Sequence, residues 1–121
     1  MSKEGLIKRL DDLTSFIVKH RDKHTCQRCG NRVSGYYCQW AHIVTRGNKT
    51  LRWDLWNSLV LCMECHHWWH HNISKAKAWF KSKFPERDEY LQSEKNKVDH
   101  ITESYLEERY KQLLPYKKGY L

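Results

Sequence analysis

The chain has no long apolar segment. None of its apolar runs approaches the roughly 20 residues of a membrane-spanning helix, so the sequence predicts no membrane anchor. The N-terminal residues are charged throughout and contain no uninterrupted apolar stretch of the secretory type. Internal repeats and low-complexity linkers are also lacking. We therefore expect a folded cytoplasmic protein.

Acidic residues are scarce between positions 19 and 52, where Asp22 is the only one. The same segment contains eight lysines and arginines, which gives it a net charge of +7. The whole chain of 121 residues carries a formal net charge of +8. This charge balance favours a polyanionic partner, most plainly nucleic acid. Solvated lysines that serve solubility are the alternative interpretation.

Cysteine occurs in a pattern that favours metal binding over disulfides. Four of the five cysteines form two knuckles, Cys26-x-x-Cys29 and Cys62-x-x-Cys65. Two knuckles at this separation predict one tetrahedral zinc site with four thiolate ligands. Thiols used in this way are typical of a reducing cytosol. We expect the fifth, Cys38, to be a small buried apolar residue.

The N-terminal half predicts a helix followed by a short hairpin around the zinc. Apolar residues recur at helical spacing over residues 3–22. Aromatic and β-branched residues over 36–44 predict a strand, and residues 45–52 form a basic loop. An apolar run within 53–61 then leads into the second knuckle.

The C-terminal half predicts only helices. The first follows Cys65 and ends near Asn72, and the second covers about 74–84 with Ser74 as its N-cap. Two more are predicted over about 86–97 and 101–114. The fold class is therefore α+β.

Four tryptophans flank or follow the second knuckle, and we interpret all of them as core residues. Trp68 and Trp69 are expected to pack against the first helix. For Trp53 and Trp56, stacking on unpaired bases is the alternative.

Four histidines follow the second knuckle directly. On a helix, His66 and His70 lie one turn apart on one face, and so do His67 and His71. Either pair could hold one divalent metal ion through imidazole nitrogens. The two pairs point about 100° apart, so we expect one of them to be the metal pair. Spacing alone does not say which.

His42 lies at the end of the predicted strand, between the two knuckles. A neutral imidazole with an ordinary pKa suits a general base that takes a proton from water at physiological pH. A metal ion beside it would polarise a phosphate oxygen. A purely structural histidine is the alternative.

These motifs occur in one order along the chain: Cys26-x-x-Cys29, Ala41-His42-Ile43, Asn57, Leu61-Cys62-x-x-Cys65-His66, and His70. Over roughly residues 24–72 they resemble the zinc-knuckle branch of the HNH endonuclease family. The resemblance implies a zinc-stapled ββα-metal core over 24–73. The N-terminal helix over 1–23 and the helical extension over 74–121 flank this core and lie outside the resemblance. It also implies metal-dependent hydrolysis of DNA phosphodiester bonds.

The resemblance gives each motif residue a role. His42 would be the general base, and Asn57 would hold the loop that carries it. His66 and His70 would bind the catalytic ion, which is Mg²⁺ or another divalent ion such as Mn²⁺ or Ni²⁺. Zinc on Cys26, Cys29, Cys62 and Cys65 would be structural. Arg46, Lys49 and Arg52 would bind neighbouring phosphates.

Ala41 departs from the family, which usually has a His or Asp metal ligand at that position. A water, another side chain or His42 itself would then complete the site. A non-catalytic zinc-stabilised nucleic-acid-binding module is the alternative function, and an adaptor of a larger nuclease or packaging complex is another. DNA is the expected partner, alongside a second copy of the chain or phage nuclease and packaging proteins. A phage origin, with the protein acting in the bacterial host cytoplasm, is implied by resemblance only.

Overall fold

The computed structural model describes residues 2–121 and begins with the predicted N-terminal helix, α1 (Lys3–Arg21). The Ser2 hydroxyl accepts a hydrogen bond from the backbone N–H of Gly5 at 3.1 Å and caps the helix start. Basic residues occupy the last turn, where they oppose the helix dipole. The prediction of a helix over 3–22 is confirmed.

The only sheet within residues 2–121 is a two-stranded antiparallel hairpin, β1 (Gln39–His42) and β2 (Ser58–Leu61). Gln39 pairs with Leu61 and His42 pairs with Ser58 at the two ends of the ladder. The strand predicted over 36–44 is therefore too long. Its start forms a short 3₁₀ turn, η1 (Gly35–Tyr37), because Gly35 adopts a φ of +55° that turns the chain.

The chain after β2 is helical, as predicted. The helices are α2 (Met63–His71), α3 (Ile73–Lys83), α4 (Pro85–Glu94) and α5 (Glu103–Lys118). Ser74 is not the N-cap of α3, because the backbone break falls at Asn72 and the helix already begins at Ile73. None of these helices, nor α1, is long and apolar enough to cross a membrane.

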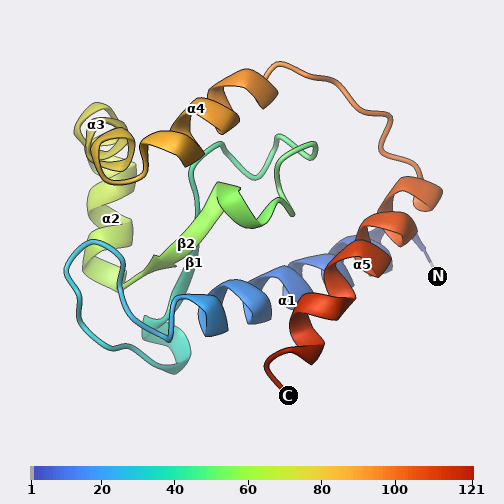
Figure 1. The fold of residues 1–121 in the computed structure, drawn as a ribbon, viewed down its shortest axis with the longest axis horizontal. Helices are drawn as coiled ribbons and strands as arrows, with labels where there is room; N and C mark the ends of the chain where they lie inside the picture. Colours follow the sequence, from blue (N-terminus) through green and yellow to red (C-terminus); the bar gives the residue numbers. More distant parts are fainter. Residues whose placement is uncertain (1) are drawn as a thin grey trace.

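The hairpin separates two groups of helices, as Figure 1 shows, with α2, α3 and α4 on one side and α1 and α5 on the other. Successive residues of β2 point to opposite faces. Leu59 and Leu61 pack in a cluster with residues of α2, α3 and α4, whereas Val60 packs against Val18 of α1. α5 packs along α1, and Trp53 is buried in the apolar cluster between them.

The tryptophans divide between core and surface. Trp53 is buried, as predicted, whereas Trp56 is 43% exposed and does not belong to the core. Trp69 is buried but packs against Trp79 and Phe80 of α3 rather than against the first helix. The expected contact with α1 is wrong, because the sheet lies between α1 and α2.

Candidate functional site

The two knuckles bring four thiols to one point. The Sγ atoms of Cys26, Cys29, Cys62 and Cys65 lie within 4.8 Å of one another, and Cys29 Sγ is 3.8 Å from Cys62 Sγ. Four thiolates bound tetrahedrally at about 2.3 Å from one zinc lie about 3.8 Å apart, so the donor set fits this ion. The cluster can therefore hold a metal ion such as zinc, as predicted, and Cys38 lies apart from it in the core.

Backbone hydrogen bonds hold both knuckles in place. The N–H of Gln27 donates to the carbonyl of Val60 at 2.9 Å, which attaches the first knuckle to β2. Gly30 turns that knuckle at a φ of +80°. In the second knuckle, Cys62 is the N-cap of α2, and its sulfur accepts a hydrogen bond from the N–H of Cys65 at 3.3 Å.

Crowding of the thiols limits how many can ionise without a cation. Burial opposes ionisation of Cys26, but hydrogen bonds from the backbone of Cys29, Cys62 and Arg28 outweigh it and lower the pKa of Cys26 to about 7. Burial, together with the neighbouring sulfur atoms, raises the pKa of Cys65 to about 12. A divalent cation removes this repulsion and favours the thiolate form of all four side chains.

Arg28 lies against the cysteine cluster from one side. Its Nη1 donates to Cys65 Sγ at 3.4 Å, and its guanidinium stacks 3.6 Å above the ring of Trp68. The pairing gives a four-thiolate site one positive neighbour. The sequence did not indicate this contact, because Arg28 and Cys65 are 37 residues apart.

His66 and His70 lie one turn apart on α2, and their rings converge. Their Nε2 atoms are 3.0 Å apart. Two nitrogens bound at about 2.1 Å to one ion, with an angle of 90° between them, lie at this same separation. Burial, and then the neighbouring His70, lower the pKa of His66 and favour its neutral, ligating form. His67 and His71 also stack on each other, but neither lines the cavity described below.

Gln39 fixes the tautomer of His66. The Nε2 of Gln39 donates to the carbonyl of Tyr36 at 3.1 Å, so its Oε1 faces His66 Nδ1 at 2.7 Å. An amide oxygen can only accept, so His66 carries its proton on Nδ1 and leaves the Nε2 lone pair towards His70. Gln39 is a site residue that the sequence analysis missed.

His42 is largely buried and ends β1, as predicted. Its Nε2 lies 3.1 Å from the carbonyl oxygen of Arg52 and must donate to it, which leaves Nδ1 as the basic nitrogen. Burial, and then the positive charges of Arg46 and Arg52, lower the pKa of His42 to about 4 against the raising effect of that hydrogen bond. The imidazole is therefore neutral at physiological pH.

Asn57 is fully buried and ties down the loop that follows His42. Its Oδ1 accepts from the N–H of Val44 at 2.8 Å, and its Nδ2 donates to the carbonyls of Val44 and Leu51 at 2.9 and 3.1 Å. The backbone carbonyl of Asn57 also accepts from the N–H of Ile43 at 2.8 Å. Asn57 thus positions both ends of the segment between His42 and Arg52, and it is too buried to meet a substrate.

The three basic residues predicted to bind phosphates differ in availability. The side chain of Arg52 is only 16% exposed and binds Asp11 through two nitrogens at 3.0 and 2.6 Å. Arg46 reaches the same carboxylate at 3.1 Å but is 57% exposed. Lys49 is half-buried in the same loop. Arg46 and Lys49 are therefore better placed for a phosphate than Arg52, which instead anchors the loop.

Asp11 is a second residue that the sequence did not reveal. Besides the two arginines, it accepts from Trp53 Nε1 at 2.8 Å. Burial raises the pKa of Asp11, but the hydrogen bonds from Arg52 and Trp53 and the two positive charges outweigh burial and lower it. Asp11 lies in α1, more than 30 residues from each of these partners, so no local sequence pattern indicates its contacts.

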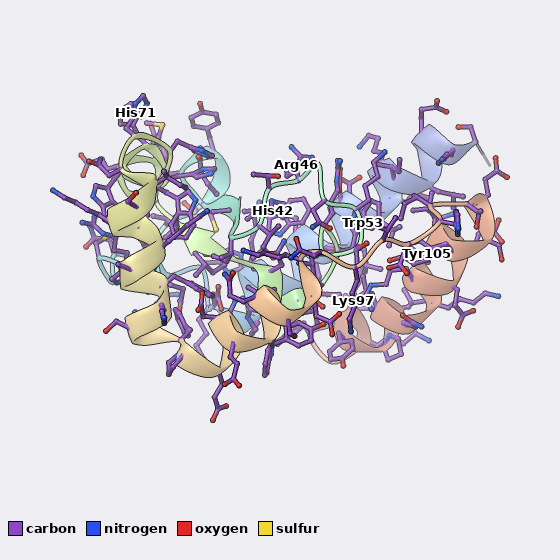
Figure 2. The ribbon with its side chains drawn as sticks, turned by 90° about the horizontal axis from the view of Figure 1, so that it is seen from above. His42, Arg46, Trp53, His71, Lys97 and Tyr105 are labelled. Atoms are coloured by element: carbon purple, nitrogen blue, oxygen red, sulfur yellow. The ribbon has the colours of Figure 1, made fainter. Side chains whose placement is uncertain are left out.

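One cavity of about 680 Å³ collects these histidines, and we call it the histidine cavity. Its walls include His42, His66 and His70, with Arg46, Lys77 and Lys95 among the basic side chains around them. Figure 2 shows His42 and Arg46 near the middle of the molecule, with His71 at its far edge. A concave site with a few convergent polar groups is the usual setting for ligand binding.

Comparisons of the chain with protein-family models, with curated proteins and with solved structures find no match. The family resemblance thus rests on the motif residues of the sequence alone.

Proposed function

We propose that the chain is a metal-dependent endonuclease that hydrolyses DNA phosphodiester bonds in the manner of HNH nucleases. The observation that carries the proposal is the histidine cavity, which gathers a neutral buried histidine and two histidines whose Nε2 atoms converge. The order of β1, β2 and α2 along the chain is compatible with the ββα-metal core that the resemblance implies, and this supports the proposal. The basic residues around the cavity suit a phosphodiester substrate.

The proton-transfer role falls to His42. Its Nε2–H is held by the Arg52 carbonyl, so Nδ1 is the atom that would accept a proton from the attacking water. A pKa of about 4 makes the free imidazole a weak base. A bound phosphate would bring negative charge close to the ring and raise this pKa towards the working pH. Asn57 acts only as a positioning residue, through the loop that it holds.

The metal-binding role falls to His66 and His70. A divalent ion bound there would supply charge neutralisation at the scissile phosphate. Gln39 would keep His66 in the tautomer that offers Nε2. We propose that zinc on the four cysteines is structural, because four thiolates leave no open coordination position.

A non-catalytic nucleic-acid-binding module is the second candidate, and one observation favours it. Among residues 2–121, the four cysteines are the only group of three or more His, Cys, Asp or Glu side chains close enough to hold a metal. The histidine pair thus has two protein ligands, and Ala41 adds none. Solvent and substrate oxygens would have to complete a catalytic ion's coordination. An adaptor role in a larger complex would share this chemistry.

Plasmid cleavage separates these candidates. The purified, zinc-loaded protein is incubated with supercoiled plasmid and Mg²⁺, Mn²⁺ or Ni²⁺, beside His42→Ala and the matched control His71→Ala. Zinc content and melting temperature are verified for each protein. We expect metal-dependent nicking or linearisation by the wild type and the control but not by His42→Ala. Salt-sensitive DNA binding without cleavage under any metal would favour the binding module.

A further inference from the structure

The histidine cavity adjoins a second, smaller hollow. This cleft of about 330 Å³ lies between the loop of residues 45–52 and the segment 95–102 that links α4 to α5. Gly47 and Lys95 line both hollows and form their common rim. We call the histidine cavity, this rim and the cleft together the basic channel. The C-terminal half of the chain therefore builds one wall of the proposed active site.

The basic channel has a net positive lining. Its five cationic side chains are Arg46, Lys49, Lys77, Lys95 and Lys97. Its two acidic side chains are Asp88 and Asp99. Lys97 also pairs with Glu94 at 2.8 Å, but the lysine is 64% exposed, and such exposed pairs are weak and readily exchanged for another anion.

Hydrogen bonds hold the two walls of the cleft together. Asn48 Nδ2 donates to the carbonyl of Lys95 at 2.8 Å, and the hydroxyl of Thr50 donates to the carbonyl of Lys97 at 3.3 Å. Lys49 lies between these two anchors in the loop. Figure 2 shows Lys97 on the linking segment beyond α4. The backbones that carry Lys49, Lys95 and Lys97 are therefore fixed relative to one another before any ligand arrives.

We propose that one strand of a polynucleotide runs from the histidine cavity over the rim of Gly47 and Lys95 into the cleft. There, Lys49, Lys95 and Lys97 bind the phosphates that neighbour the one at the histidines. The inference rests on the proposed function for the identity of the substrate. A cleft of about 330 Å³ is at the lower end for a ligand site, so it takes one nucleotide of one strand and not a duplex.

Lysine contacts of this kind bind phosphate as point charges and read no sequence. Binding in the basic channel should therefore be independent of sequence and steeply dependent on salt. For single strands, each phosphate contact contributes about 0.7 to the slope of log K against log salt. A variant that lacks two of these contacts should have a slope smaller by about 1.4. When the salt concentration rises from 50 to 200 mM, its affinity should therefore fall by a factor about sevenfold smaller than that of the wild type.

The test is fluorescence anisotropy with a labelled single-stranded oligonucleotide, with the zinc-loaded protein and no other divalent ion. The double variant Lys95→Ala/Lys97→Ala is compared with Lys111→Ala/Lys118→Ala. The control pair removes the same charge from exposed positions of α5 that line neither hollow. Melting temperature, zinc content and an intact oligonucleotide are checked for each protein. We expect the reduced slope only in the first variant.

Equal slopes in both double variants, or no salt-dependent binding by the wild type, would contradict the proposal that a strand binds in the basic channel. Plasmid cleavage measured in parallel keeps the two proposals apart. Cleavage without the expected change in slope would support the proposed endonuclease function and contradict the proposed binding of a strand in the basic channel. The expected change in slope without cleavage under any metal would support the basic channel as a binding site and contradict the proposed hydrolysis.

Discussion

Replacement of Asn57 by alanine tests how the loop after His42 is held. The side chain of Asn57 is fully buried and makes three hydrogen bonds to the backbone of Val44 and Leu51. Alanine removes all three and leaves the N–H and the carbonyl of Val44 without a partner, whereas the Leu51 carbonyl still accepts from the N–H of Asp54 at 3.0 Å. Asn57→Asp should be no more stable than Asn57→Ala. Its second carboxylate oxygen would face the two carbonyl oxygens to which the amide nitrogen now donates hydrogen bonds.

The magnitude follows from the number of groups left unpaired. Each buried polar group without a partner costs about 1–3 kcal/mol. Water can reach part of the half-buried Val44, so we expect a total loss of about 2–4 kcal/mol in the free energy of unfolding. This is a large share of the stability of a small domain. For a chain of this size, it corresponds to a fall in melting temperature of about 7–16 °C.

The assay is a thermal melt at fixed excess zinc, followed by circular dichroism. The matched control is Asn72→Ala, which removes one exposed hydrogen bond of 3.3 Å to the carbonyl of Trp68. We expect the control to cost less than about 1 kcal/mol. A melting temperature of Asn57→Ala within about 3 °C of the wild type would refute the assignment of Asn57 as the anchor of the loop.

Three further predictions follow from other contacts. Cys62→Ser should lower zinc content and helical signal together, and a chelator should unfold the wild type, because structural zinc contributes on the order of 10 kcal/mol to folding. The pKa of His42 is about 4 in the folded protein against 6.5 ordinarily, so the unfolded chain binds this proton more readily. Stability should therefore fall by up to about 3 kcal/mol as the pH drops from 6.5 to 4, and urea titrations should show a flatter profile for His42→Asn. Asp11→Asn weakens the charge-assisted contacts to Arg46 and Arg52 and should cost about 2–3 kcal/mol in a thermal melt, whereas an unchanged melt would show that these pairs contribute nothing.

The sequence predicted the elements whose signals are local. The periodicity of Leu6, Leu10, Leu13 and Ile17 gave α1 because the burial of one helical face follows directly from spacing. The Cys-x-x-Cys spacing gave the metal cluster for a similar reason, since two residues of turn geometry bring the paired thiols together. The choice of His66 and His70 came from the family resemblance. The structure adds that this pair, and not His67 and His71, lines the same cavity as His42.

Features that depend on distant partners could not be read from the sequence. No sequence pattern around Asp11 indicates its contact with Arg52, because the two residues lie in different elements. The same is true of the hydrogen bond between Gln39 and His66. The length of β1 depended on a positive φ at Gly35. The packing of Trp69 on α3 depended on which face of the sheet α2 covers.

The most direct test of the central claim compares the two histidine pairs of α2. Plasmid cleavage in Mn²⁺ is measured for the wild type, for His66→Ala/His70→Ala and for His67→Ala/His71→Ala, each with verified zinc content. The two double variants make the same change one residue apart on the same helix. We predict that the wild type and the 67/71 variant cut the plasmid, whereas the 66/70 variant does not. Equal cleavage by both variants, or none by any protein including the wild type, would contradict the proposal.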